Sequence, residues 1–397
     1  MNKLVVELKN TTPLLVGWYT PRRADIRGLR TTEIKGIWRW WARAFIGGAL
    51  YDEGLLNGVG TNDVLLRPSK KEVECIAKLV GIELGLGLAI ARESQASRFT
   101  IYVEPLDSIT PKDMRDRWRR ISLLTIKKSV EGFDASHRFR LNVEWSRDFR
   151  YRLTALKILL IALQFTGVGK GSRRGLGSLD VVSISPSLEE RDLRSLVREA
   201  YDECSELVRR HTKTYGARSS GNKAVELPPL PVVSKRTTSE VPVAEMKVFR
   251  DVHRRRFEDV HNFFVRTERC RILYYSPICH DELRKEKAAW FLGLPRFQKE
   301  RTQRETGYKA EVERRASPIM LAFHTDKNKF GSGAFVTCFL SGDWPKKIEW
   351  HGDHTEKPEK LNINAEAVVN AYKVFSNEFL RYLRGLNVGH QVDAIWP

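Results

Sequence analysis

The segment at residues 167–177 reads GVGKGSRRGLG and combines five glycines with three cations and no acidic residue. Glycine adopts positive φ without strain and lets another chain segment approach closely. Successive backbone N–H groups in such a turn form a concave site for an anion. Lys170, Arg173 and Arg174 place full positive charges beside it. The segment therefore predicts a cradle for a phosphate backbone.

The surroundings of this segment exclude two common nucleotide-binding loops. A P-loop has Ser or Thr after its lysine, but Gly171 follows Lys170 here. A dinucleotide-binding loop leads from a strand into a helix. This segment instead follows an apolar predicted helix at 151–166 and leads into a predicted strand at 179–184. The alternative is a helix C-cap at Gly167 with a solvated basic turn, for which one glycine would suffice.

Composition points to a partner with many negative charges. The chain has 397 residues, is 42% hydrophobic and carries a net charge of +19. This length predicts two or three domains with real cores. A strongly positive field attracts nucleic acid or acidic membranes. A basic surface without such a partner is the less specific alternative.

The cysteines and the apolar patterning indicate where the protein resides. Five cysteines at wide spacings do not form a disulfide framework, which favours a reducing cytosol. The first residues lack the layout of a signal peptide. No uninterrupted apolar window reaches the length of a membrane span. We therefore expect a cytoplasmic protein with no membrane contact.

An arginine-rich loop precedes the first predicted helix. The loop spans 19–30 and contains four arginines and one acid, Asp25. The helix is predicted over 33–46, ending at Gly47-Gly48. Its buried face follows a helical period and comprises Ile34, Trp38, Trp41 and Phe45. A separate basic stripe comprises Lys35, Arg39 and Arg43, and Trp40 flanks it, where it would stack on a base. The alternative is a solvated basic face with the tryptophans in the core.

The order of predicted elements in the first half is strand, helix, two strands, helix, glycine-rich loop and strand. It matches the split βαβ layout of a ferredoxin-like domain. A further basic helix is expected at 111–126 and another helix at 72–80. The principal elements lie at 3–8, 33–46, 98–103, 139–145, 151–166 and 179–184.

The second half shows the segregated helices and strands of an α+β fold. Residues 212–240 lack periodicity and predict a flexible connection. The domains are therefore predicted at 1–187 and 241–397, with a helix and linker at 188–240. Helices are expected at 188–211, 248–266 and 366–386, and strands at 271–275 and 334–340, with residues 314–323 leading into a further strand.

Three motifs together resemble the RAMP superfamily of CRISPR RNA-binding proteins. They are TPLLVG at 12–17, EIKGIWRWWARA at 33–44 and GKGSRRGLG at 169–177, and RRASP at 314–318 resembles a further segment of one of its subunits. The tryptophan-rich helix is most similar to subunit one of type III-B (Cmr) effector complexes. Only Gly17 follows the first strand, where relatives often carry paired glycines. Residues 57–97 and 212–240 have no counterpart in the resemblance.

The resemblance implies a fold, partners and a binding site. It implies two ferredoxin-like, RRM-type domains with helical insertions, in a subunit near the 3′ end of the guide RNA. Other RAMP subunits would lie beside it in an antiviral complex that captures target RNA. The resemblance carries over Lys35, Arg39 and Arg43 of the helix and the glycine loop at 169–177 as residues that face RNA. With Trp40, which the helix pattern adds, the expected RNA-binding residues are Lys35, Arg39, Trp40, Arg43, Gly169, Lys170, Gly171, Ser172, Arg173, Arg174 and Gly175.

Catalysis is the main alternative to RNA binding alone. A RAMP-type, metal-independent endoribonuclease needs a general base, and the candidates are His137 and Asp25. Zinc ligands are suggested weakly by Cys270, Cys279-His280, His351 and His354, none of which shows the usual paired spacing. We expect His351 and His354 in a loop, and no catalytic residue, metal or cofactor. A third hypothesis is a basic module that binds only proteins, which predicts no salt-dependent RNA binding.

Overall fold

The computed structural model describes most of the chain. The described residues are 2–17, 22–90, 93–114, 118, 121, 129–145, 148–186, 192–216, 226–264, 282–294, 296–299, 305–311, 315–351 and 357–397.

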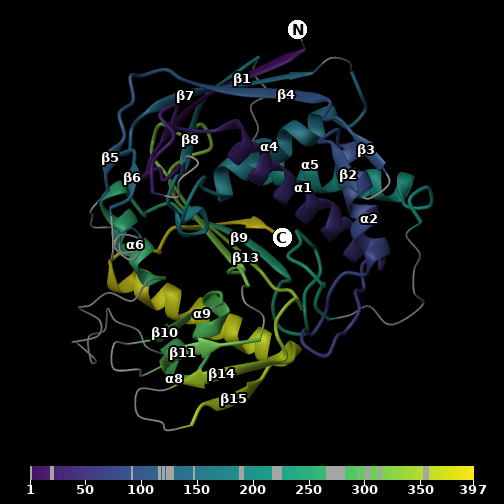
Figure 1. Ribbon diagram of the computed structural model, residues 1–397, viewed down its shortest axis with the longest axis vertical. Helices are drawn as coiled ribbons and strands as arrows, with labels where there is room; N and C mark the ends of the chain where they lie inside the picture. The colour runs from purple at the N-terminus through teal and green to yellow at the C-terminus, as the bar shows by residue number, and fades with distance from the viewer. Residues whose placement is uncertain are drawn as a thin grey trace.

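The first half forms a ferredoxin-like domain (Figure 1). Its antiparallel sheet has the order β4-β7-β1-β8, in which the first and last strands of the motif are neighbours and the second lies at the far edge. The two motif helices follow the first and third strands, as the split βαβ prediction requires. The elements are β1 (Lys3–Asn10), α1 (Thr31–Asp52), β4 (Phe99–Pro105), β7 (Arg138–Trp145), α4 (Arg152–Phe165) and β8 (Leu179–Ser185).

The second half repeats this topology, which confirms the predicted α+β fold with two ferredoxin-like domains. Its sheet has the order β12-β13-β9-β16, again with antiparallel neighbours. The elements are β9 (Ala244–Phe249), α6 (Phe257–Phe263), β12 (Ile319–His324), β13 (Gly333–Phe339), α9 (Ala365–Gly385) and β16 (Val392–Trp396).

One helix prediction in the second half is wrong over its first half. Residues 244–249 form strand β9, followed by a 3₁₀ turn (Arg254–Arg256), whereas a helix was expected over 248–266. Ala244, Met246 and Val248 are buried in alternation, and the strand pairs with β13 on one side and β16 on the other, so the segment follows the two-residue period of a strand. The strand expected at 271–275 lies outside the described residues.

Smaller elements are inserted into both domains. A third sheet of order β10-β11-β14-β15 extends the C-terminal half beside α8 (Glu282–Lys285) (Figure 1). The helix expected at 72–80 is present as α2. Of the helix expected at 111–126, residues 112–113 form a strand and most of the rest lies outside the described residues. The inserted elements are α2 (Lys70–Lys78), a π turn (Leu79–Glu83), β2 (Leu88–Ile90), β3 (Glu93–Gln95), β5 (Lys112–Asp113), β6 (Glu131–Gly132), a 3₁₀ turn (Ala289–Leu292), β10 (Arg296–Lys299), β11 (Glu305–Lys309), β14 (Lys347–His351) and β15 (Glu359–Asn362).

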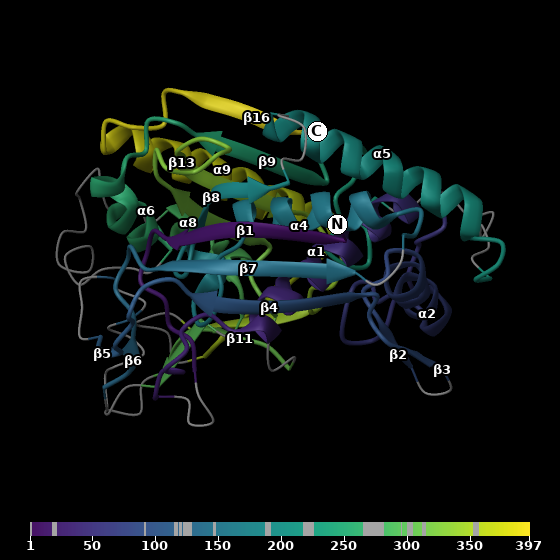
Figure 2. The same cartoon turned by 90° about the horizontal axis from the view of Figure 1, so that it is seen from above.

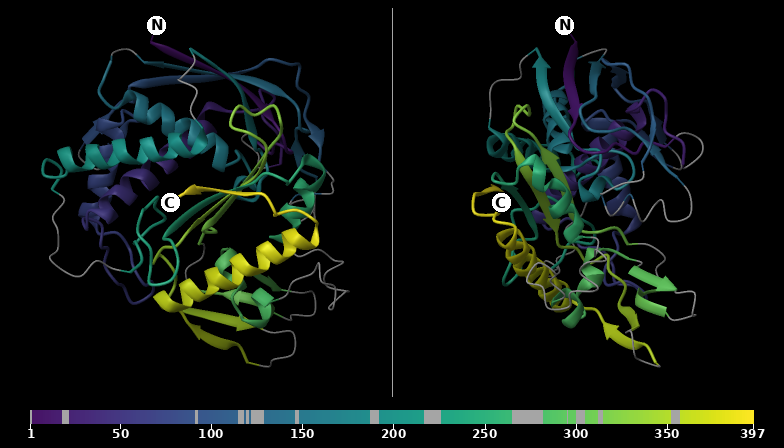
Figure 3. Two further views of the ribbon diagram at one scale, coloured as in Figure 1. Left: turned by 180° about the vertical axis from the view of Figure 1, so that it is seen from behind. Right: turned by 90° about the vertical axis from the view of Figure 1, so that its left-hand side faces the viewer.

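The helices of the first domain lie between the two sheets. Helices α1, α4 and α5 (Leu193–His211) cover one face of the C-terminal sheet, and α9 covers its other face (Figures 2 and 3). Strands β12 and β13 are consequently buried at every position. One hydrophobic cluster joins Trp41 of α1 to Phe335 and Phe339 of β13. The two halves therefore share a core.

Helix α1 is longer than predicted because its paired glycines do not end it. The helix runs through Gly47 and Gly48 to Asp52. A Cβ on Gly48 would lie 1.6 Å from the carbonyl oxygen of Val233, and one on Gly47 would lie 2.9 Å from the Val232 side chain. These glycines therefore allow another backbone segment to lie against the helix.

That segment belongs to the stretch expected to be flexible. The Val233 amide donates to the Ala44 carbonyl at 2.9 Å, and Val232 and Val233 are fully buried. The indole of Trp396 donates to the Ser234 carbonyl at 2.8 Å. The expectation of flexibility is therefore wrong for these residues, because they fill the space between α1 and β16. The domain boundaries remain predictions.

Candidate nucleic-acid interface

The glycine-rich loop leaves α4 and turns back through left-handed backbone conformations. Helix α4 ends at Phe165, and residues 172–174 form a single 3₁₀ turn. Four loop glycines have positive φ, with values of 78° at Gly169, 75° at Gly171, 82° at Gly175 and 66° at Gly177. The predicted need for glycine in the left-handed region is confirmed at these positions.

Close packing against the segment after β1 accounts for the position of this loop. The Lys170 amide donates to the Leu15 carbonyl and the Gly177 amide to the Pro13 carbonyl, both at 2.9 Å. A Cβ on Gly169 would lie 2.5 Å from the Leu15 carbonyl oxygen. Gly175 is buried, and a Cβ there would lie 2.3 Å from the ring of Phe323. The part of the loop that reaches the surface is therefore 169–174.

Two of the three loop cations are bound to the C-terminal domain. Arg173 donates to the Ser317 carbonyl at 2.8 Å, and Arg174 donates to the Leu292 carbonyl. Burial lowers the pKa of Arg173 to about 10, and the nearby positive charge of Arg315 adds to this effect. Lys170 is partly exposed, and burial lowers its pKa as well. Lys170 is thus the loop cation with most freedom to meet a phosphate.

The basic stripe of α1 likewise contains both a cation bonded to a backbone carbonyl and cations that face solvent. Arg39 donates through Nε to the Leu86 carbonyl at 2.9 Å, which ties it to the turn before β2. Lys35 is partly exposed and Arg43 is exposed. Partial burial lowers the pKa of Arg43, with the charge of Arg39 adding to the effect. Lys35 and Arg43 therefore present the accessible charge of this stripe.

Trp40 connects the helix to the loop. Its ring lies 5.5 Å from that of Phe339, and the guanidinium carbon of Arg173 lies 5.3 Å from its centroid. The structure thus brings the two predicted halves of the site together at this residue. Trp38 and Trp41 are buried as predicted, and their indoles donate to Ala155 O and Thr166 Oγ1, each at 2.7 Å. Base stacking on Trp40 stays a prediction.

The residues considered for catalysis have local structural bonds. Asp25 is buried, not solvated as a lone loop acid would be, and its carboxylate accepts the Arg27 amide at 3.0 Å. The His137 amide donates to the Asn10 side chain at 2.8 Å, beside strand β7. His351 ends strand β14 and does not lie in the expected loop. Cys270, the Cys279-His280 pair and His354 are outside the described residues.

The open face of the N-terminal sheet carries charges that pair with one another. Lys3 binds Glu144 at 3.2 Å, and Arg138 binds Asp107 at 2.9 Å. Tyr102 is the one aromatic residue among the exposed large hydrophobic side chains that the structure describes. RRM sheets bind single-stranded RNA by stacking bases on several aromatics. Among the described residues, this face therefore presents no group of strongly exposed aromatics like that of an RRM.

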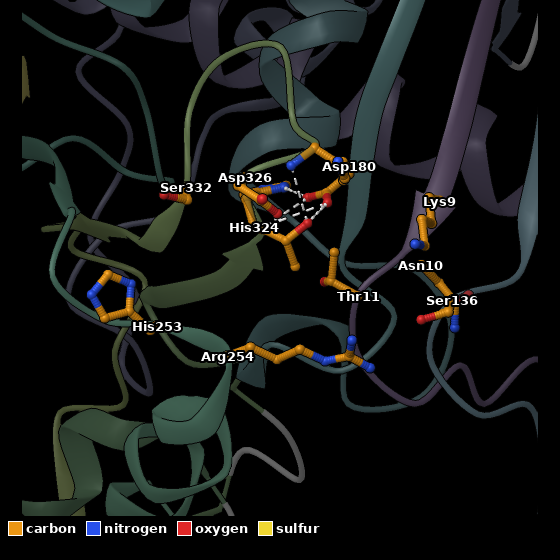
Figure 4. Close-up of a pocket in the computed structure, with 12 residues that line it drawn as sticks. Lys9, Asn10, Thr11, Ser136, Asp180, His253, Arg254, His324, Asp326 and Ser332 are labelled. Carbon is orange, nitrogen blue, oxygen red and sulfur yellow. Dashed lines mark hydrogen bonds and ion pairs between the residues drawn. The ribbon is translucent and has the colours of Figure 1, made fainter.

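A hollow of about 480 Å³ lies between the domains, and sequence reasoning missed it (Figure 4). Its lining includes Lys9 from β1, Arg254 from the turn before α6 and Lys327 from the β12–β13 connection. No linear motif marks these residues because they come from distant segments that only the fold brings together.

The topology and the junction loop define a protein with two ferredoxin-like domains and a basic glycine-rich loop between them. Residues 7–180 match the model of the RAMP superfamily. The chain is 28% identical over 186 residues to CRISPR system Cmr subunit Cmr1-2 of Pyrococcus furiosus, covering 46% of this chain and 96% of the relative. The resemblance found in the sequence is thereby confirmed.

The crystal structure of a related protein has a similar fold. The crystal structure of Cmr1 from Pyrococcus furiosus in its apo form matches with a TM-score of 0.51 and 16% identity, over 100% of this chain and 99% of that one. A chain in the cryo-EM structure of type III-B Cmr-beta bound to cognate target RNA matches with a TM-score of 0.48 and 16% identity, over 95% and 99%. At these identities the likeness concerns the fold. Within the described part of the chain, no helix is long and apolar enough to cross a membrane.

Proposed function

We propose that this chain is an RNA-binding, non-catalytic subunit of a type III-B CRISPR (Cmr) effector complex in the cytoplasm. It would lie near the 3′ end of the guide RNA, beside other RAMP subunits, and help to capture target RNA. The contact between Arg173 and Trp40 supports this most directly, because it brings the glycine-rich loop and the basic helix together.

The accessible charges of that surface are those expected to meet phosphate. Lys170 on the loop and Lys35 and Arg43 on α1 have partly or fully exposed side chains. Arg39, Arg173 and Arg174 donate to backbone carbonyls, so their contribution to RNA binding would be partly indirect, through the shape of the surface. Phosphate contacts fix the position of a strand without reading its sequence.

Salt dependence tests the RNA-binding proposal. Each lost phosphate contact reduces the slope of log K against log salt by about 0.7 for single strands. The double variant Lys170→Ala/Arg43→Ala should flatten the slope by about 1.4 in a titration of labelled single-stranded RNA. Lys70→Ala/Lys71→Ala removes the same charge from exposed positions on α2 and serves as the matched control. Equal slopes for the two double variants would refute this surface as the RNA site.

The endoribonuclease alternative has a separate test. Purified protein is incubated with labelled guide and target RNA, with and without a divalent metal. We expect no site-specific cleavage, because the Asp25 carboxylate is buried and accepts the Arg27 amide. Cleavage that disappears in Asp25→Ala or His137→Ala would make the protein an enzyme.

A further inference from the structure

A cleft made of two adjoining hollows lies at the junction of the two domains. The hollow of about 480 Å³ adjoins a second one of about 560 Å³, and both are lined by Thr11 and Arg254. The first opens between strand β1 and the β12–β13 connection (Figure 4). The second continues past Asp134 and Arg255. Two adjoining hollows form an elongated depression.

Positive side chains run along this cleft. Lys327, Lys9 and Arg254 line the first hollow, and Arg254 and Arg255 line the second. Lys9 is partly exposed and the other three are exposed. Within the described ranges, none of the four forms an ion pair with a carboxylate. In contrast, Arg138 and Lys3 on the open sheet face are paired with acids.

Most carboxylates near the cleft are bonded to other protein groups. The Asp180 carboxylate, which is fully buried, accepts the Thr325 amide at 3.1 Å and faces Nδ1 of His324 at the same distance. Asp134 is bound to Lys112 at 2.8 Å. Asp326 is exposed at the rim of the first hollow, and Glu258 lines the second. Unpaired positive charge therefore dominates the path from Lys327 to Arg255.

We propose that this cleft binds the phosphodiester backbone of single-stranded RNA, so that a strand crosses the domain junction. This inference rests on the proposed RNA-binding function and adds a second contact region to it. Four cations along an elongated depression suit several consecutive phosphates. A free nucleotide would instead need an enclosed, mostly apolar pocket for its base. The first hollow is lined by lysine, arginine, histidine, hydroxyl and carboxyl groups, which do not provide that environment.

The first test compares salt slopes in the full-length chain. Lys9→Ala/Arg254→Ala removes two cleft cations, and Lys70→Ala/Lys71→Ala removes two exposed cations from α2. We expect the cleft variant to flatten the slope by about 1.4 relative to the control, about 0.7 for each lost contact. Thermal melting checks that both variants are folded. Equal slopes in the two variants, with salt-dependent RNA binding in the wild type, would overturn the cleft and leave the proposed function standing. Absence of salt-dependent RNA binding in the wild type would overturn both.

A mapping experiment does not depend on substitution. A single-stranded RNA containing 4-thiouridine is irradiated with the wild-type protein, and the crosslinked peptides are identified. We expect crosslinks in the peptides that carry residues 9–13 and 253–258. Crosslinks confined to 35–43 and 169–174 would overturn the proposal. Uridine monophosphate is then added as a competitor. We expect a ten-nucleotide strand to compete far better, and equal competition would instead indicate a free-nucleotide pocket.

Discussion

The guanidinium of Arg173 lies over the ring of Trp40, with 5.3 Å between its central carbon and the ring centroid. Arg173 also donates to the Ser317 carbonyl, and Trp40 lies against Phe339 of the C-terminal sheet. This pair therefore joins α1, the glycine-rich loop and the second domain. The pair therefore contributes to stability, because a loop predicted to bind phosphate also connects the two domains.

The coupling between these two residues is measurable. Trp40→Ala and Arg173→Ala should each lower the free energy of unfolding, by about 2–3 kcal/mol for the tryptophan, which is only partly buried. The cation–π contact predicts a coupling energy of about 0.5–2 kcal/mol in a double-mutant cycle followed by denaturant unfolding. A cycle between Trp40 and Lys71 on α2 is the control and should give additive effects. Additivity in the Trp40–Arg173 cycle would show that the contact contributes nothing.

Two glycines on one helix should respond oppositely to alanine. Gly48→Ala places a Cβ 1.6 Å from the Val233 carbonyl oxygen and should destabilise the protein by about 3 kcal/mol or more. A Cβ on Gly36 meets nothing within 4 Å, so Gly36→Ala should stabilise the helix by about 0.5–1 kcal/mol. Thermal melting of the two variants measures both effects. Similar changes in the two would mean that the 226–240 segment does not lie tightly against α1.

Periodicity predicted the parts of the fold that depend on local pattern. The buried face of α1 and the alternation in β1 and β7 repeat with fixed spacing, so each could be recognised within one segment. The order of elements then favoured the split βαβ topology, which the sheet order confirms. Strand β9 was missed because its polar neighbours include His253 and several arginines, which resemble a basic helix when taken alone.

The site was less predictable because its geometry depends on contacts between distant residues. In the sequence, the glycines of the loop and of α1 indicate a cradle and a helix end. In the structure they also permit close approach to Leu15, Phe323 and Val233. The hydrogen bond from Arg173 to the Ser317 carbonyl joins residues far apart in sequence. The sequence alone does not show whether a basic side chain will donate to a backbone carbonyl or face solvent.

The loop itself provides a test of positive φ against close packing. Gly175 has φ of 82° and its Cβ would lie 2.3 Å from Phe323, whereas Gly54, after α1, has φ of 72° and open space around it. Gly54→Ala should destabilise the protein by about 1–2 kcal/mol, from backbone strain alone. Gly175→Ala should destabilise it by a further 1–3 kcal/mol, because the ring of Phe323 must move. Equal losses in chemical denaturation would mean that the loop does not press on strand β12.

The first turn of α1 carries a carboxyl whose ionisation opposes folding. Burial raises the pKa of Glu33, and the salt bridge to Arg30 at 3.1 Å only partly offsets this. Because the folded-state pKa lies above the unfolded one, ionisation of Glu33 lowers stability as pH rises through that raised value. Below the unfolded value both states are protonated and the effect disappears. The free-energy difference between Glu33→Gln and wild type should therefore favour the variant more at pH 7 than at pH 4.

A second carboxyl gives this pH experiment a control of opposite sign. Hydrogen bonds from Arg138 lower the pKa of Asp107 in the folded state. Its ionised form therefore stabilises the protein above the unfolded pKa, and that contribution is lost as pH falls through the folded one. Asp107→Asn should accordingly be less stable than wild type at pH 7 and closer to it at pH 3, by a small amount because the pair is well exposed. The denaturant midpoints of Glu33→Gln and Asp107→Asn, each measured against wild type from pH 3 to pH 7, test both assignments. If the two stability differences changed with pH in the same direction, burial would not be the dominant influence on the pKa of Glu33.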